Sequence, residues 1–166
     1  MPGLTAPMGE PEPWLDDDAP GDPAELLTDV VPRLYRILRA ALDEDPELPS
    51  LEQLRVMNRI TDGIRYASTL ATARQMRISA ITPLIDGLVS RRWVTRSPEP
   101  EDRRRIRLDL TPEGEAALEA GRNKTGERLR EVLRHGESGE KTTEVAAVAA
   151  WLEQAVRRYD SQRLNG

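Results

Sequence analysis

The 166-residue sequence contains no cysteine, no phenylalanine and only one histidine. Without cysteine there is no disulfide, thiolate nucleophile, cysteine-ligated zinc or cysteine redox sensor. The single histidine, His135, excludes sites that need several histidines. No apolar run approaches the roughly 20 residues of a membrane-spanning helix, and the first residues lack the basic start and apolar stretch of a secretory signal. We therefore expect a cytoplasmic protein that is not an enzyme and uses no cofactor or metal.

Charge is distributed unevenly along this chain, whose net charge is −5. Residues 1–29 hold eight acidic residues and no basic one, whereas residues 55–107 hold twelve arginines against five acidic residues. A basic segment inside an acidic protein is typical of a surface that faces DNA. Residues 1–21 are rich in proline, glycine and acid, which predicts a flexible tail. This tail either stays a solvated leader or competes with DNA for the basic face.

Hydrophobic spacing predicts an N-terminal helix, for which Asp22 and Pro23 supply the cap and the first helical residue. Pro32 interrupts the apolar stripe, so the helix is either kinked there or restarts from Asp29. The run Asp43-Glu44-Asp45-Pro46 ends it.

Three short helices are predicted next. Ser50 and Gln53 form a capping box at the start of the first helix. The second covers residues 69–77 and is capped by Ser68 or Thr69, and the third runs from residue 79 to about residue 91.

The hydrophobic period then changes from helical to alternating. Residues 93–96 and 105–110 read as two strands, and the charged residues 97–103 read as the loop between them. Three short helices followed by a β-hairpin form a winged helix-turn-helix, in which one helix enters the major groove of DNA and an arginine of the hairpin reaches the minor groove.

Two helices are predicted after the hairpin. Thr111 and Pro112 cap and begin a long helix that ends at His135-Gly136, and Ser138 caps a last helix that ends near Asp160. Their apolar stripes are too extensive for one small domain to cover, which favours an obligate dimer with an interface of roughly 2,000 Å² or more. The alternative is that these helices pack within one chain.

The fold class predicted is therefore mostly α with a small β-hairpin (α+β). The expected parts are the tail (1–21), an N-terminal dimerisation helix (22–45), the winged helix-turn-helix (46–111) and C-terminal dimerisation helices (112–166).

Three segments of the chain resemble the MarR family of bacterial transcription regulators. They are LEQLRVMNRI, STLATARQMRISAITPLIDGL and RRWVTRSPEPEDRRRIRLDLTPEGEAAL. The resemblance is close over roughly residues 50–121, and its most specific part runs from V-x-R through P-x-P-x-D-R-R to L-T-P-x-G. It implies a winged-helix homodimer, interleaved through its first and last two helices, that binds an inverted repeat of double-stranded DNA and blocks the polymerase.

The resemblance also implies which residues contact DNA. Asp102 would hold the wing while Arg104 reaches the minor groove, and the flanking Arg103 and Arg105 would touch phosphate. The other matching positions lie at the helix start that commonly contacts phosphate, at the turn before the recognition helix and at that helix's start: Ser68, Thr69, Arg77, Ser79, Ala80 and Thr82.

Two residues depart from the family pattern. Pro83 stands where a polar or basic residue is usual, so either Thr82 caps a shortened helix or the helix is kinked. Arg92 replaces a favoured glycine, and a left-handed backbone would be strained at arginine, which predicts a different turn.

Many members of the family bind a small aromatic or amphipathic ligand between the dimer helices and the winged lobe, which changes the separation of the lobes. The resemblance suggests Tyr35, Arg39, Met57, Ile60 and Tyr66 for this role, and core packing is the alternative for each. We therefore expect a sequence-specific, dimeric repressor of transcription that a ligand relieves. The alternative function is a winged-helix protein-interaction module with weak or lost base-specific DNA binding.

Overall fold

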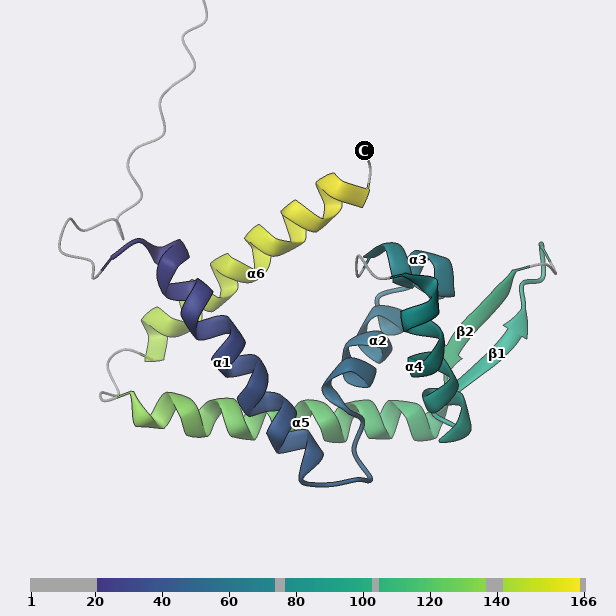
Figure 1. The fold of residues 1–166 in the computed structure, drawn as a ribbon, viewed down its shortest axis with the longest axis horizontal. Coiled ribbons are helices and arrows are strands. Elements are labelled where there is room, and N and C mark those ends of the chain that lie inside the picture. The colour runs from purple at the N-terminus through teal and green to yellow at the C-terminus, as the bar shows by residue number, and fades with distance from the viewer. Residues whose placement is uncertain (1–20, 74–76, 103–104, 137–141, 165–166) are drawn as a thin grey trace, which may run out of the picture. The chain divides into compact units, whose positions relative to one another are not determined.

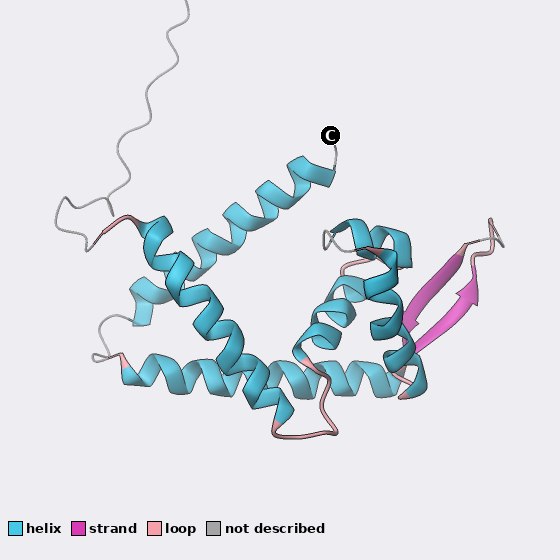
Figure 2. Ribbon diagram, viewed as in Figure 1, coloured by secondary structure: helices cyan, strands magenta, loops and turns pink. Residues whose placement is uncertain are grey.

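The computed structural model describes residues 21–73, 77–102, 105–136 and 142–164. In chain order its elements are α1 (Pro23–Asp43), α2 (Leu51–Thr61), α3 (Ala67–Ala73), α4 (Ile78–Ser90), β1 (Val94–Pro98), β2 (Ile106–Leu110), α5 (Pro112–His135) and α6 (Thr142–Leu164) (Figure 1). The chain forms two compact units, residues 1–36 and 37–166, and their boundary falls within α1. The expected class, mostly helical with one small hairpin, is confirmed (Figure 2). Apart from Gly21, the expected flexible tail lies outside the described residues.

Helix α1 begins as predicted, because the Asp22 carboxylate accepts a hydrogen bond from the backbone N–H of Ala24 at 2.9 Å. Pro32 lies inside this helix, which continues to Asp43. The restart at Asp29 is therefore wrong. A proline inside a helix removes one backbone hydrogen bond, and the remaining bonds of this 21-residue helix keep it continuous.

The hydrophobic core of residues 37–166 joins the three short helices to the hairpin. Six of its side chains, which come from α2, α3, α4 and β2, are at most 3% exposed: Met57, Leu70, Ile81, Ile85, Leu88 and Leu108. Leu42 at the end of α1 and Leu118 on α5 complete this core. Burying each such side chain contributes about 1.5–3 kcal/mol, so this packing holds α4 and the hairpin in one unit.

The start of α2 agrees with the sequence prediction, whereas the start of α3 does not. Ser50 and Gln53 form the expected capping box. Helix α3 begins one residue before Ser68, and the carbonyl of Tyr66 accepts the hydrogen bond of Leu70 N–H at 2.8 Å. Ser68 and Thr69 therefore lie in the first turn and do not cap the helix. The helix was expected to reach Arg77, but the backbone of Arg77 is extended and Arg77 precedes α4, so that expected end is wrong. Residues 74–76 lie outside the described residues.

Helix α4 runs through Pro83, so the shortened helix capped by Thr82 is wrong. Pro83 is the sixth residue of the helix, and it has no N–H to donate to the carbonyl of Ser79. The buried side chains of Ile81 and Ile85, on either side of the proline, hold this segment in helical form.

The strands of the hairpin are shifted from the prediction, since β1 starts at Val94 and β2 at Ile106, each one residue later than expected. The antiparallel strands pair Val94 with Leu110 and Pro98 with Ile106, so β1 extends two residues into the expected loop. Beyond Pro98, the N–H of Glu99 donates to the carbonyl of Arg105 at 2.9 Å. Figure 2 shows this hairpin projecting from the helices.

The turn from α4 into β1 adopts the left-handed conformation that was expected to be avoided. Arg92 has a φ of +60°. Its N–H donates to the carbonyl of Val89, and Trp93 N–H donates to that of Leu88, both at 2.9 Å. This pair of bonds is the Schellman motif that usually ends on glycine. The prediction of a different turn is therefore wrong, because the two hydrogen bonds and the buried Trp93 fix the backbone.

Thr111 connects this turn to α5. Its hydroxyl donates to the carbonyl of Arg92 at 2.6 Å and accepts from the N–H of Gly114 at 2.9 Å, which makes Thr111 the predicted N-cap. Helix α5 ends at Gly136 as expected. Helix α6 continues to Leu164, beyond the predicted end, and Ser138 lies outside the described residues.

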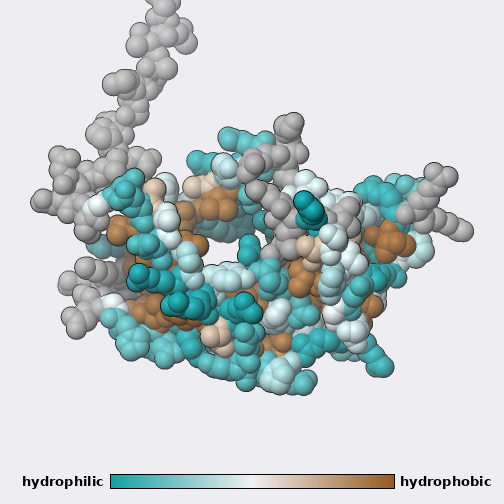
Figure 3. All heavy atoms as spheres, viewed as in Figure 1, coloured by the Kyte–Doolittle hydropathy of each residue, from teal (hydrophilic) through white to brown (hydrophobic). Residues whose placement is uncertain are grey.

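Helix α6 leaves apolar side chains in solvent. Val148 is 60% exposed, Val156 51% and Tyr159 57%. Figure 3 shows hydrophobic residues gathered over this helix. Among the described residues, no helix is both long and apolar enough to cross a membrane.

Candidate nucleic-acid interface

The first turns of α4 present a polar, solvent-exposed face. Ser79, Ala80 and Thr82 are all exposed, while Ile81 between them is fully buried. The structure thus brings the three expected base-contacting residues together at the N-terminal end of one helix. Because backbone N–H groups and the positive end of the helix dipole meet there, such an end attracts phosphate and base acceptor groups.

Arg77 lies directly before this helix. Its backbone is extended, and its carbonyl accepts from the N–H of Ala80 at 2.9 Å. In the part of the chain that the structure describes, no carboxylate lies within ion-pair distance of its exposed guanidinium. Ser68 and Thr69 are also exposed on the first turn of α3, so they are available to a ligand in solvent.

The end of the hairpin carries the remaining expected residues. Arg103 and Arg104 lie outside the described residues. Asp102 is exposed, and its carbonyl accepts from the N–H of Arg105 at 2.8 Å. The guanidinium of Arg105 stacks on the ring of Tyr66, with its central carbon 3.9 Å from the ring centroid.

Tyr66 also makes a short hydrogen bond that the sequence analysis missed. Its hydroxyl donates to the carboxylate of Glu99 at 2.5 Å. The bond raises the pKa of Tyr66 above its usual value of about 10, because ionisation would place two negative charges side by side, and partial burial adds to the rise. Since 33 residues separate the partners, no local spacing in the sequence indicates this contact.

Several arginines of the basic segment are paired within the protein. Asp109 accepts from Arg65 at 3.0 Å and from Arg107 at 2.8 Å, and the latter hydrogen bond raises the pKa of Arg107. Arg96 on β1 pairs with Asp86 on α4 at 2.6 Å. The pairs made by Arg65 and Arg96 fasten the hairpin to its surroundings, whereas that of Arg107 lies within β2. Counting charges in the sequence therefore overstates the number of unpaired arginines. Arg107 and Asp109 share a face because residues two apart on a strand point the same way, a signal the sequence did contain.

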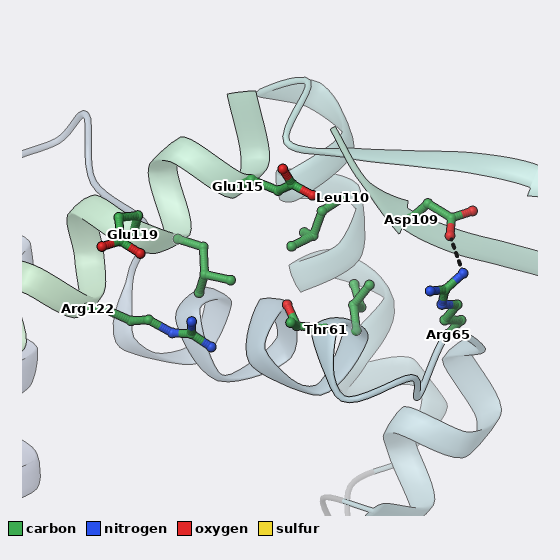
Figure 4. Close-up of a pocket in the computed structure, with 9 residues that line it drawn as sticks. Thr61, Arg65, Asp109, Leu110, Glu115, Glu119 and Arg122 are labelled. Atoms are coloured by element: carbon green, nitrogen blue, oxygen red, sulfur yellow. Dashed lines mark hydrogen bonds and ion pairs between the residues drawn. The ribbon is translucent and has the colours of Figure 1, made fainter. Parts of the chain in front are cut away.

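A cavity of about 460 Å³ lies between the end of α2, strand β2 and the first half of α5 (Figure 4). Its lining combines apolar and charged side chains: Ile60, Thr61, Arg65, Asp109, Leu110, Glu115, Leu118, Glu119 and Arg122. In Figure 4 the ion pair between Arg65 and Asp109 forms one end of this lining. Among the described residues, no three His, Asp or Glu side chains gather as metal ligands would.

The five residues suggested for ligand binding are placed differently. Ile60 lines this cavity, whereas Met57 is fully buried in the core and Tyr66 faces the hairpin. Arg39 is exposed and pairs with Asp43 on α1 at 3.5 Å. Tyr35 belongs to the unit formed by residues 1–36, where it is 37% exposed.

Sequence comparison places this chain among known regulators. The model of the MarR family matches residues 50–106, the segment from the start of α2 into β2. An uncharacterized HTH-type transcriptional regulator of Bacillus subtilis, YpoP, is 30% identical over 98 residues, which cover 59% of this chain and 68% of that protein. The multiple antibiotic resistance protein MarR of Salmonella typhimurium is 34% identical over 56 residues, 34% of this chain and 39% of that protein.

Solved structures show the same fold. A mutant of MarR from E. coli in which one cysteine is replaced by serine superimposes with a TM-score of 0.70 at 24% identity, covering 84% of this chain and 99% of the other. The same mutant complexed with operator DNA gives a TM-score of 0.60 at 26% identity, over 80% and 91% of the two chains. The winged-helix fold and the family implied by the sequence motifs are confirmed. The chain belongs to the MarR family of winged helix-turn-helix transcription regulators, which are not enzymes.

Proposed function

We propose that this regulator is a sequence-specific repressor that binds an inverted repeat of DNA as a homodimer and releases it when a small ligand binds. The observation that carries the proposal is the exposed face at the start of α4, where Ser79, Ala80 and Thr82 lie together beside a fastened hairpin. A structural relative at 26% identity has been solved with operator DNA, which supports the same use of this surface.

In this proposal the start of α4 enters the major groove. Ser79 and Thr82 offer hydroxyl groups to base edges, and the small Ala80 allows close approach. Arg77, at the turn before this helix, meets backbone phosphate. Ser68 and Thr69 meet phosphate from the first turn of α3.

The wing supplies the second contact in this proposal. Arg104 enters the minor groove, where the negative potential attracts guanidinium groups. Arg103 and Arg105 flank it near phosphate, and Asp102 holds the wing.

A second copy of the chain would cover the apolar stripe of α6. Val148, Val156 and Tyr159 are more than half exposed, and patches of this kind on regulators mark association surfaces. In the unit formed by residues 1–36, Leu26 and Val31 on α1 are 49% and 54% exposed. Two such faces supply the apolar area that an obligate dimer interface requires.

The cavity shown in Figure 4 is the place we propose for the ligand. Its apolar side chains suit the body of a small amphipathic molecule, and its charged side chains suit a polar group. Arg65 and Asp109 belong to the winged lobe while Glu119 and Arg122 belong to α5. A ligand touching both sides favours one spacing between them and so changes DNA affinity.

Fluorescence anisotropy with labelled duplexes from the region upstream of the protein's own gene tests the proposal. Affinity should fall steeply between about 50 and 300 mM salt, because phosphate contacts release counterions. Arg77→Ala should weaken binding and lower the salt slope by about one. Arg130→Ala, which removes an exposed arginine from α5, serves as the matched control and should bind as the wild type does.

Two results would contradict the proposal. Absence of binding to every upstream duplex at about 100 mM salt would favour the protein-interaction module instead. Binding that is equally tight to unrelated duplexes would show that the exposed start of α4 does not read bases.

A further inference from the structure

Tyr66 lies where the loop before α3 meets the far end of the hairpin. Its hydroxyl donates to Glu99 at 2.5 Å, and its ring lies under the guanidinium of Arg105 at 3.9 Å. Glu99 and Arg105 face each other across the hairpin, since the N–H of Glu99 donates to the carbonyl of Arg105. One side chain thus holds both arms of the wing at the point where they leave the paired strands.

The rest of the hairpin is fastened at other points. The N–H of Leu108 donates to the carbonyl of Arg65 at 2.8 Å, and the guanidinium of Arg65 pairs with Asp109. Arg96 pairs with Asp86 on α4. These contacts hold the base of the wing, but all of them lie on the body side of the Pro98–Ile106 pair.

Beyond that pair, Tyr66 connects the described residues of the wing to α3. A two-stranded ribbon is marginally stable in water when nothing packs against it. A hydrogen bond to a carboxylate is stronger than one between neutral groups, and a cation over an aromatic ring adds attraction. Both interactions start from a tyrosine whose own carbonyl accepts the first hydrogen bond of α3, so the wing is tied to a rigid helix.

We propose that Tyr66 is a positioning residue for DNA binding: by holding Glu99 and Arg105, it sets where the tip of the wing meets the duplex. This inference rests on the proposed function. A wing already held in its binding position loses less conformational freedom on association, so the hydroxyl of Tyr66 increases affinity without touching DNA.

The central variant is Tyr66→Phe, which removes the bond to Glu99 and keeps the ring under Arg105. We expect operator affinity to fall roughly 3- to 10-fold, the effect of one lost hydrogen bond. The salt slope should stay unchanged, because no phosphate contact is lost. Amide hydrogen exchange in the absence of DNA should become faster in residues 99–107 and stay unchanged in α4.

Three further variants make the test specific. Glu99→Gln keeps an acceptor oxygen and should retain most of the affinity, whereas Glu99→Ala should match Tyr66→Phe. The double variant of Tyr66→Phe with Glu99→Ala should lose no more than either single variant, because both remove the same interaction.

The outcomes separate this inference from the function on which it rests. If the wild type binds no upstream duplex, the proposed function is wrong. If the wild type binds, the variants test the role of Tyr66. Unchanged exchange in Tyr66→Phe would overturn the inference, and so would faster exchange with wild-type affinity. A salt slope lowered by about one would also overturn it, since the hydroxyl would then contact phosphate directly.

Discussion

Gly114 lies against Trp93 so closely that a Cβ atom on the glycine would be 1.9 Å from the carbonyl oxygen of the tryptophan. Helix α5 therefore begins with its backbone in contact with the residue that leads into the wing. This contact gives a physical reason for the glycine of the L-T-P-x-G motif, which the sequence presented only as a family signature.

Gly114→Ala should destabilise the protein by about 2–3 kcal/mol, because α5 or the chain at Trp93 must move to admit a methyl group. Chemical denaturation followed by circular dichroism measures the change. Gly126→Ala is the matched control on the same helix, where the nearest atom to an added Cβ is 3.7 Å away on the flexible Arg130. The control should be about 0.5–1 kcal/mol more stable than the wild type. Equal denaturant concentrations at the unfolding midpoints of the two variants would contradict the steric explanation.

Arg92→Gly should stabilise the fold by about 0.5–1 kcal/mol. The left-handed backbone at Arg92 costs about 1–3 kcal/mol at a non-glycine residue, and the greater freedom of glycine in the unfolded chain offsets part of the gain. Arg92→Ala keeps the Cβ atom and should give no such gain. A thermal melt of the three proteins separates these expectations, and a less stable glycine variant would show that the arginine side chain stabilises the turn.

Acid should weaken the junction between the α1–α2 loop and α5 through Glu44. Its carboxylate accepts from Lys124 at 3.0 Å and Arg128 at 2.8 Å, and these hydrogen bonds lower the pKa of Glu44. The stabilisation is present above the unfolded pKa of about 4.3 and is lost as the pH falls through the lower folded pKa.

Unfolding free energies between about pH 2 and pH 7 test this sign. Glu44→Gln should lower the unfolding free energy at neutral pH. It should also make that free energy depend less steeply on pH below about pH 5. Glu127 is an exposed glutamate on α5, so Glu127→Gln should leave the pH dependence of the unfolding free energy as it is in the wild type. A Glu44→Gln curve parallel to that of the wild type would refute the linkage.

Val148→Glu should convert the proposed homodimer to monomer, because a charge would enter the apolar stripe of α6 where Val148 is 60% exposed. Sedimentation velocity at micromolar concentration reports the change. Gln154→Glu adds the same charge on another face of the helix and should remain dimeric. A wild type that sediments as a monomer would remove the dimer from the proposed mechanism.

Local signals in the sequence predicted most of the elements. The capping box of Ser50 and Gln53 and the cap at Thr111 depend on residues within three positions, so the sequence alone reveals them. The hairpin was visible in the alternation of residues 105–110 because one face must be buried, although only Leu108 is fully so. Helix α4 was placed to within a residue, yet its passage through Pro83 depends on core packing that no local rule contains.

Features made by distant partners could not be predicted in this way. Two examples are the hydrogen bond between Tyr66 and Glu99 and the ion pair of Arg96 with Asp86. Their partners come together only in the folded chain, so no local pattern in the sequence indicates them. Arg92 was expected to avoid a left-handed turn because local strain was considered alone. Its carbonyl is held by Thr111, 19 residues later, and that tertiary bond helps to offset the strain.

The hydrogen bond from the hydroxyl of Thr111 to the carbonyl of Arg92 links the end of α4 directly to the start of α5. Helix α5 has 24 residues and is therefore a rod of about 36 Å. A rod of that length acts as a lever: a tilt of about 5° displaces its far end by about 3 Å. In the proposed dimer, a small tilt of α5 at the end where two subunits meet therefore shifts the winged lobe at the other end by about 3 Å, without any bending of that lobe.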